Sequence, residues 1–357
     1  MTTRQGGDIV LICGEGRGVH RTRRSVCVLV TCVALVVLGA LPVACAGSGS
    51  SGPSGNSRTL VVGFSEVYEG QVPAWLAQDE GLFKKHGLDV QLQYMQSNTV
   101  VAALGSGQAQ FALGGGSEVV SANAGGADLK LLGALVPVFP YRMEAPASIA
   151  TLHDLAGKQV GISSPGSESD IATRLGLRRV GLDPDRDVHL TPVGSSQNRT
   201  AALKNGAIQG GLDQPPFSFQ LEKSGFHSLF DMAALKIPAV NNAISVKQSY
   251  LQSHHDVAQR FVDALVEGLA LIKKSREATI RVIGKHLKVT DPPVLDATYT
   301  FETSELFPAL PYVRADQLQA TVQALPQRNH KVAGVNLNRM LDGSFVQSAA
   351  DRSVQSS

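Results

Sequence analysis

The chain has 357 residues, 43% of them hydrophobic, which is enough for two lobes with separate hydrophobic cores. Residues 46–357 have a net charge near −1, because five arginines and only two acidic residues precede them, and no basic patch indicates a nucleic-acid-binding protein. All four cysteines lie within the first 45 residues, so hydrophobic packing rather than disulfide bonds must stabilise the rest of the chain.

The N-terminal region has the pattern of an export signal. Arginines within residues 21–24 precede an apolar run over residues 26–41, and small residues lead to Cys45. A membrane-spanning helix needs roughly 20 apolar residues, so this shorter run is typical of a signal peptide. We expect residues 1–44 to be a signal peptide with an N-terminal extension, and residues 45–57 to hold a lipidated cysteine and a flexible linker.

The expected cleavage site leaves an alternative open. The run Leu41-Pro-Val-Ala-Cys45 resembles a bacterial lipoprotein cleavage box, except that Pro42 stands where Leu or Val is usual. The alternative is a plain secretory signal cut at Ala44 or Ala46, with an incidental cysteine. The lipoprotein interpretation anchors the protein through a lipid on Cys45 at the outer face of the bacterial cytoplasmic membrane.

A weak internal repeat follows the linker. Residues 102–113 share a pattern of Ala, Leu, Gly and Gln with residues 201–212, and Gly-Leu-Asp occurs at both 87–89 and 181–183. Each copy is predicted to form a strand, a helix, a turn, a strand, a short helix ending in glycine, and a strand. Alternating strands and helices indicate parallel sheets with right-handed crossovers. We therefore predict an α/β fold with two duplicated lobes and a ligand cleft between them.

The loops that follow the predicted strands supply the candidate ligand-binding residues. In open α/β sheets, ligands bind beyond the carboxyl ends of the strands. The loops at these ends are rich in Ser, Gly, Asn and Pro, so hydroxyl groups and backbone amides are available. The predicted ligand-binding residues are Ser65, Glu66, Tyr68, Trp75, Ser97, Asn98, Gly116, Ser117, Ser164, Gly166, Ser167, Asn198, Arg199, Asp213 and Gln214.

Some of these residues also have an ordinary structural interpretation. Ser117 and Ser167 are expected at helix starts, where free amides suit an anionic or polar group, but both could be simple N-caps. Glu118 and Glu168 would then only complement the helix dipoles. Trp75, the only tryptophan, could stack on a ligand or belong to the core.

The charged candidate residues also have two alternative interpretations. Glu66 and Asp213 could each accept a hydrogen bond from an amine or N–H group of a ligand, or could cap a local turn. Arg142 and Arg199 could pair with a carboxylate or sulfonate, or could be solvated. The scarcity of basic residues in these loops argues against a bare inorganic anion as ligand.

The C-terminal part lacks the repeat and is predicted to be helical. Residues 253–272 carry an apolar stripe at helical spacing, with Ser253 and Asp256 as a capping box. Asp291 precedes a proline at an expected helix start, and residues 316–325 resemble another helix. We expect this region to cover one lobe. The scattered histidines show no metal-site spacing.

Several motifs together resemble one family. Residues 73–90 are similar to the first-lobe signature of the substrate-binding proteins of nitrate, sulfonate, taurine and thiamine-precursor ABC importers. Residues 152–158 resemble the entry into the second lobe of that family. Residues 213–216 and 342–346 follow in the family's order, so the similarity covers about residues 58–347.

The resemblance implies a two-lobed type II periplasmic-binding-protein fold. The chain would cross between lobes near 138–150 and 236–243. Lobe 1 would then comprise residues 58–140 and the returning segment 241–347, lobe 2 would comprise residues 141–240, and residues 348–357 would be a tail.

The resemblance also implies a function. The protein would be the extracytoplasmic solute-binding component of an ABC importer, a monomer without catalytic activity, cofactor or metal. It would capture a sulfonate, taurine, nitrate, an aromatic carboxylate or a pyrimidine-like solute and deliver it to a permease driven by an ATPase. One alternative is a ligand-sensing lipoprotein that signals to a membrane partner. Another is an enzyme similar to a thiamine-pyrimidine synthase, although residues 46–357 lack that enzyme's cysteine-rich iron-binding run.

Overall fold

The computed structural model describes residues 59–325 and 330–355. The chain divides into two units, Met1–Ser54 and Gly55–Ser357, and the described residues belong to the second unit. The expected signal peptide, the linker and the lipidated Cys45 therefore lie outside the described residues and stay predictions. Within the described ranges, no helix combines the length and the apolar character needed to cross a membrane.

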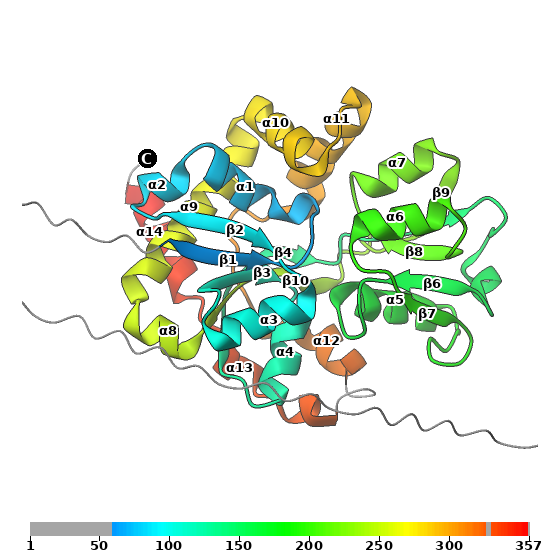
Figure 1. The fold of residues 1–357 in the computed structure, drawn as a ribbon, viewed down its shortest axis with the longest axis horizontal. Coiled ribbons are helices and arrows are strands. Elements are labelled where there is room, and N and C mark those ends of the chain that lie inside the picture. The colour runs from blue at the N-terminus through cyan, green and yellow to red at the C-terminus, as the bar shows by residue number, and fades with distance from the viewer. Residues whose placement is uncertain (1–58, 326–329, 356–357) are drawn as a thin grey trace, which may run out of the picture. The chain divides into compact units, whose positions relative to one another are not determined.

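The first sheet has five strands in the order β2-β1-β3-β10-β4. The strands are β1 Leu60–Phe64, β2 Val90–Tyr94, β3 Phe111–Gly114, β4 Leu129–Val138 and β10 Pro238–Lys247. The helices of this part are η1 Glu69–Gln71, α1 Val72–Asp79, α2 Leu82–Lys85, α3 Ser97–Ser106 and α4 Gly116–Ala124. In Figure 1, α1 lies on one side of this sheet and α3 and α4 lie on the other. The step from β1 to β2 and the step from β2 to β3 run in opposite directions across the sheet, so right-handed crossovers place their helices on opposite faces.

The second sheet also has five strands, in the order β7-β6-β8-β5-β9. The strands are β5 Arg142–Pro146, β6 Gln159–Ile162, β7 His189–Pro192, β8 Gly210–Asp213 and β9 Phe226–Asp231. The helices are η2 Leu152–Leu155, α5 Glu168–Arg179, α6 Ser196–Lys204 and α7 Phe217–Lys223. Figure 1 shows α5 on one side of this sheet and α6 and α7 on the other.

The two sheets confirm the predicted duplication. Strands β2-β1-β3 and β7-β6-β8 have the same order and the same parallel pairing. The predicted turn glycines Gly87 and Gly181 have φ of 69° and 82°, a backbone conformation that favours glycine over other residues. The expected parallel pairing is confirmed for the repeated strands, but it does not extend to the whole of either sheet, because β10 and β5 run antiparallel to their neighbours. These are the strands that follow the two changes of sheet.

The C-terminal part consists of helices. They are α8 Gln248–Ser253, α9 His255–Lys274, α10 Arg276–Leu287, α11 Pro292–Phe301, the π-helix η3 Glu302–Leu306, η4 Ala315–Leu318, α12 Gln319–Ala324, η6 His330–Gly334, α13 Leu337–Met340 and α14 Ser344–Gln355. The predicted apolar stripe of α9 is buried, and Phe261 stacks on Phe111 of β3 at a centroid distance of 4.3 Å. Asp291 precedes α11 as expected.

Two expectations for this region are wrong. Ser253 does not cap α9, because it ends α8, where its hydroxyl donates to the Ser249 and Tyr250 carbonyls. The C-terminal helices also contact helices of both sheets rather than one. Helix α12 packs on α5 of the second sheet, and an ion pair joins Lys223 of α7 to Asp291 at the start of α11.

Candidate functional site

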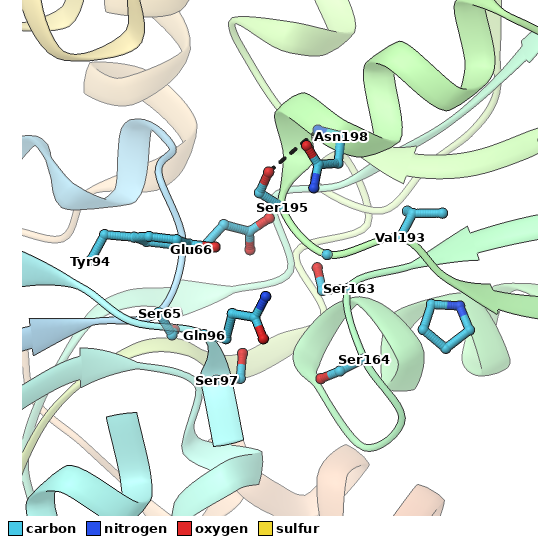
Figure 2. A pocket seen from close by; sticks show the side chains of 12 residues that line it. Ser65, Glu66, Tyr94, Gln96, Ser97, Ser163, Ser164, Val193, Ser195 and Asn198 are labelled. Atoms are coloured by element: carbon cyan, nitrogen blue, oxygen red, sulfur yellow. Dashed lines mark hydrogen bonds between the residues drawn. The ribbon is translucent and has the colours of Figure 1, made fainter. Parts of the chain in front are cut away.

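A cavity of about 360 Å³, called here the main cavity, lies at the carboxyl ends of strands from both sheets. Ser65 and Glu66 follow β1, and Tyr94 ends β2. On the second sheet, Ser163 follows β6 and Ser195 follows β7. Figure 2 shows these side chains from the two sheets around the same space. The lining consists of Ser65, Glu66, Tyr94, Gln96, Ser97, Ser163, Ser164, Pro192, Val193, Gly194, Ser195 and Asn198.

A smaller space of about 10 Å³, called here the recess, adjoins the main cavity. The two share Ser65, Glu66, Ser97 and Ser163 as lining residues. The remaining lining of the recess is mostly buried and includes two further carboxyl groups. These additional residues are Tyr68, Gly115, Glu118, Tyr141, Ser167, Glu168, Ser169 and Asn241.

Glu66 connects the first sheet to the start of α6 on the second. Its Oε1 accepts hydrogen bonds from the Ser196 backbone N–H at 3.1 Å and from the Ser196 hydroxyl at 2.6 Å. The guanidinium of Arg199 lies 3.5 Å from the same oxygen. Ser196 is the first residue of α6, so the carboxylate occupies a position where a helix N-terminus favours negative charge.

Glu168 makes the reverse connection, from the second sheet to α4 on the first. The backbone N–H of Ser117, the second residue of α4, donates to Glu168 Oε1 at 2.8 Å. The Glu118 carboxylate accepts a hydrogen bond from the Ser117 hydroxyl at 3.3 Å. The helix start at Ser117, which the sequence marked as a site for an anionic group, is therefore in contact with a carboxyl group of the protein itself, and the same holds for the start of α6, which the sequence did not mark.

Two of the three carboxyl groups that line the recess, Glu118 and Glu168, have raised pKa values. Burial, together with the neighbouring Glu118 charge, raises the pKa of Glu168 to about 8. Burial likewise raises the pKa of Glu118 above its ordinary value. Two carboxylates in one desolvated site disfavour the state in which both are ionised. Near pH 7 the Glu168 carboxyl group therefore favours its protonated form, and a nearby positive charge would favour its ionisation.

Comparison with protein families identifies the group to which this fold belongs. A family model described as NMT1/THI5 like matches residues 71–278, which is more than half of the chain. The chain belongs to the NMT1/THI5-like family. A protein of Brucella abortus (strain 2308), whose name describes it only as a candidate binding protein, is 29% identical over 233 residues, or 64% of this chain and 71% of that protein.

Solved structures confirm the predicted fold of this NMT1/THI5-like protein. The periplasmic aliphatic sulphonate-binding protein SsuA of Escherichia coli has a TM-score of 0.64 and 22% identity, covering 79% of this chain and 91% of that one. The periplasmic nitrate-binding protein NrtA of Synechocystis PCC 6803 has a TM-score of 0.67 and 15% identity, covering 82% of this chain and 88% of that one. The chain thus has the two-lobed type II periplasmic-binding-protein fold.

The predicted site residues of this NMT1/THI5-like protein fall into distinct groups. Those that line the main cavity are Ser65, Glu66, Ser97, Ser164 and Asn198, and those that line the recess include Tyr68 and Ser167. Those outside both linings are Trp75, Gly116, Ser117, Gly166, Arg199, Asp213 and Gln214. Asn98 lies on α3, and its side chain lies outside the described part of the structure.

Arg199 and Asp213 form a buried pair beneath the main cavity. Of the two alternatives for Arg199, the solvated one is excluded, because its side chain is fully buried and donates to the hydroxyls of Ser163 and Ser196, each at 2.9 Å. Asp213 lies 3.5 Å from Arg199 and accepts a 2.7 Å hydrogen bond from Thr200. Burial raises the pKa of Asp213 to about 6, although the Arg199 charge opposes this shift. The pair therefore holds hydroxyl groups in place rather than facing the cavity.

Trp75 belongs to the core rather than to the cavity. Its side chain is 3% exposed and stacks on His286 of α10 at a centroid distance of 4.7 Å. Its ring also meets Phe64 edge-on at 6.3 Å. Gly116 lies against Val240 and Leu318, which likewise gives it a packing role.

Sequence reasoning missed several lining residues. Tyr94 and Pro192 end the two matching strands β2 and β7, so the strand boundary itself could have identified them. For Glu118 and Glu168 the sequence indicates only that they complement helix dipoles. Asn241 lies inside β10, where nothing in the local pattern indicates a binding role. Within residues 59–325 and 330–355, no group of His, Cys, Asp or Glu side chains is arranged to hold a metal ion.

Proposed function

We propose that this protein is the extracytoplasmic solute-binding component of an ABC importer. It captures a small organic solute in the main cavity and the recess and delivers it to a membrane permease that an ATPase drives. The observation that carries this proposal is the cavity lined by equivalent strand ends of two duplicated halves. Membership of the NMT1/THI5-like family supports the same class of function.

The lining of the main cavity favours binding over chemical conversion. It supplies serine hydroxyls, two amide side chains, one carboxylate and one tyrosine, and it contains no His, Cys or Lys among the described residues. Activated nucleophiles usually need a base within hydrogen-bond reach. Here the Ser163 hydroxyl accepts from Arg199, a guanidinium that cannot act as that base.

The two changes of sheet provide the proposed hinge. The chain passes from β4 to β5 between Val138 and Arg142, and from β9 to β10 between Asp231 and Pro238. We assign residues 58–140 and 241–347 to lobe 1 and residues 141–240 to lobe 2, although β10 of the first sheet already begins at Pro238, just before the second boundary. Solute bound between the lobes would favour the closed form through a hinge motion, and the permease would recognise that form.

The proposal includes anchoring at the membrane. A lipid on Cys45 would tether the monomer to the outer face of the cytoplasmic membrane, with residues 46–57 as a flexible link. Such a tether keeps the solute-binding lobes close to the permease without restricting their orientation, which raises the effective concentration of the pair.

Thermal denaturation with a solute panel tests the function. The panel contains nitrate, taurine, alkyl sulfonates, aromatic carboxylates, pyrimidines and amines. Each solute is added to protein purified in the form that the bacterial expression host produces. A solute at about 100 times its Kd stabilises the folded state by roughly 2.7 kcal/mol, which raises Tm by a few degrees for a chain of this length.

A pair of serine variants locates the binding. Ser164→Trp fills the main cavity and should abolish the rise in Tm, whereas Ser304→Trp changes an exposed residue of η3 and should retain it. A rise in Tm that survives Ser164→Trp would contradict the assignment of the cavity as the solute site.

A further inference from the structure

We propose that the recess binds a primary ammonium group, so that the solute is a small organic amine whose remaining atoms occupy the main cavity. This inference rests on the proposed function, because it names the chemical class of the solute held in that same site. Three observations support it. The recess contains buried hydrogen-bond acceptors without partners, the positions that would suit an anion are occupied by carboxyl groups of the protein, and the recess has the size of a single small group.

The first observation is a pair of buried acceptors without partners. Glu168 is 4% exposed, and its Oε2 has no hydrogen-bond partner among the described residues, although Oε1 accepts from Ser117. Asn241 is 5% exposed, and its Oδ1 is also unpartnered, while its Nδ2 donates to the Tyr68 hydroxyl at 3.1 Å. Buried polar groups are nearly always paired in folded proteins. An ammonium group offers three donors and no acceptor, which suits these oxygens.

The second observation concerns the anion positions. The starts of α4 and α6 face carboxylates contributed by the opposite sheet, through Ser117–Glu168 and Ser196–Glu66. A nitrate or sulfonate placed at these amides would displace a carboxylate and would meet the remaining negative charge of Glu118. A cation meets the opposite situation, because opposite charges attract strongly in a desolvated site.

The third observation is the size of the recess. A volume of about 10 Å³ is close to the space that one water molecule needs, and an ammonium nitrogen is similar in size. Gly115 keeps this space open, because a Cβ atom at that position would lie 2.6 Å from Glu168 Cγ and would also collide with the Glu118 carboxylate. The main cavity next to it has room for the rest of a small solute, with the half-exposed Tyr94 ring as one wall.

Binding of a cation should be accompanied by the release of a proton. Burial raises the pKa of Glu168 to about 8, so its carboxyl group holds a proton at pH 7 before the amine binds. The ammonium group favours the ionised carboxylate, and the proton leaves to solvent. The other titratable groups around the recess are Glu118, Glu66, Tyr68 and Tyr141, from α4, the loop after β1 and the segment between β4 and β5.

Isothermal titration calorimetry with matched compounds tests the inference. The pairs are taurine and ethanesulfonate, benzylamine and benzyl alcohol, and butylamine and butanol, with nitrate as a separate anion. At least one amine should bind at least tenfold more tightly than its amine-free partner. At pH 7 the enthalpy of that amine should also vary with the ionisation enthalpy of the buffer, in the direction of proton release.

Two variants act on the recess itself. Glu168→Gln keeps an oxygen for the Ser117 N–H but removes the charge, and it should reduce the preference for the amine at least tenfold. Gly115→Ala places a methyl group in the recess and should have the same effect. The matched controls are Glu277→Gln, whose side chain is 94% exposed, and Gly105→Ala, which meets no atom within 4 Å. Both controls should bind like the unaltered protein.

The outcomes separate this inference from the proposed function. If nitrate, ethanesulfonate or another amine-free compound binds as tightly as any amine, or if Glu168→Gln and Gly115→Ala both leave the preference unchanged, the ammonium site is overturned and the proposed function stands. If no compound binds, and mass spectrometry of the protein mixed with a bacterial cell extract detects no retained small molecule, both proposals are overturned.

Discussion

Replacing Asp213 with alanine should destabilise the folded protein strongly. Asp213 and Arg199 are both fully buried, and the aspartate also accepts the 2.7 Å hydrogen bond from Thr200. Removing one partner of a buried pair leaves an uncompensated charge, which typically costs about 3–5 kcal/mol. Glu66 still lies 3.5 Å from Arg199 and would offset part of this loss. We therefore expect a decrease of about 3 kcal/mol in the free energy of unfolding.

Urea denaturation followed by circular dichroism measures this change. The control is Asp296→Ala, because Asp296 pairs with Arg276 at the surface and both side chains are more than half exposed. An exposed pair of this kind contributes at most about 1 kcal/mol. If Asp213→Ala lowers the free energy of unfolding by less than 1 kcal/mol, the buried pair is not the constraint on Arg199 that its geometry indicates.

Three further predictions concern other parts of the molecule. The Glu144 carboxyl group is buried without a partner among the described residues, and burial raises its pKa to about 8. This value exceeds the ordinary value of 4.5 that applies to the unfolded chain. The contribution of the protonated Glu144 to the free energy of unfolding should therefore be lost as the pH rises from about 4.5 through 8. Relative to the unaltered protein, Glu144→Gln should thus gain stability over that range in urea titrations, and a constant difference would contradict this reasoning. Trp75→Ala should cost about 3–5 kcal/mol in the same assay, since its ring is packed in the core, and a loss below 1 kcal/mol would be inconsistent with that packing. Cys45→Ala should release the protein from the membrane fraction with its solute affinity intact, and a loss of binding would show that the cysteine does more than anchor.

The duplicated fold could be predicted from the sequence because its signals are local. A strand, a helix and a glycine turn each depend on residues close in the chain, and Gly87 and Gly181 have the backbone conformation that their positions indicated. Local patterns also mislead when two elements compete for one residue. Ser253 fits a capping box, but α8 already includes it, and α9 begins at His255 instead.

The candidate site was predictable only in part, because it depends on contacts between distant segments. Glu66 could be selected from its place after a strand, but its partner Ser196 is 130 residues away. The sequence indicates that Glu168 complements the dipole of its own helix, whereas its carboxyl group contacts Ser117 of α4, a helix that packs on the other sheet. Whether Arg199 is solvated depends on which face of α6 packs inward, and that is decided by the sheet beneath it.

The exchange of carboxylates between the two sheets has a consequence for how the protein moves. Glu66 completes the start of α6, and Glu168 completes the start of α4, so each half supplies a part that the other half lacks. If the halves separated, the starts of α4 and α6 would lose these hydrogen-bond acceptors, and water would hydrate the carboxyl groups of Glu66 and Glu168. The hydrogen bonds between the halves therefore favour their approach before any solute arrives, and hydration of the buried carboxyl groups on opening offsets part of this preference. If the protein delivers a solute to a permease, as proposed above, the permease would have to supply contacts that replace these hydrogen bonds when the halves separate.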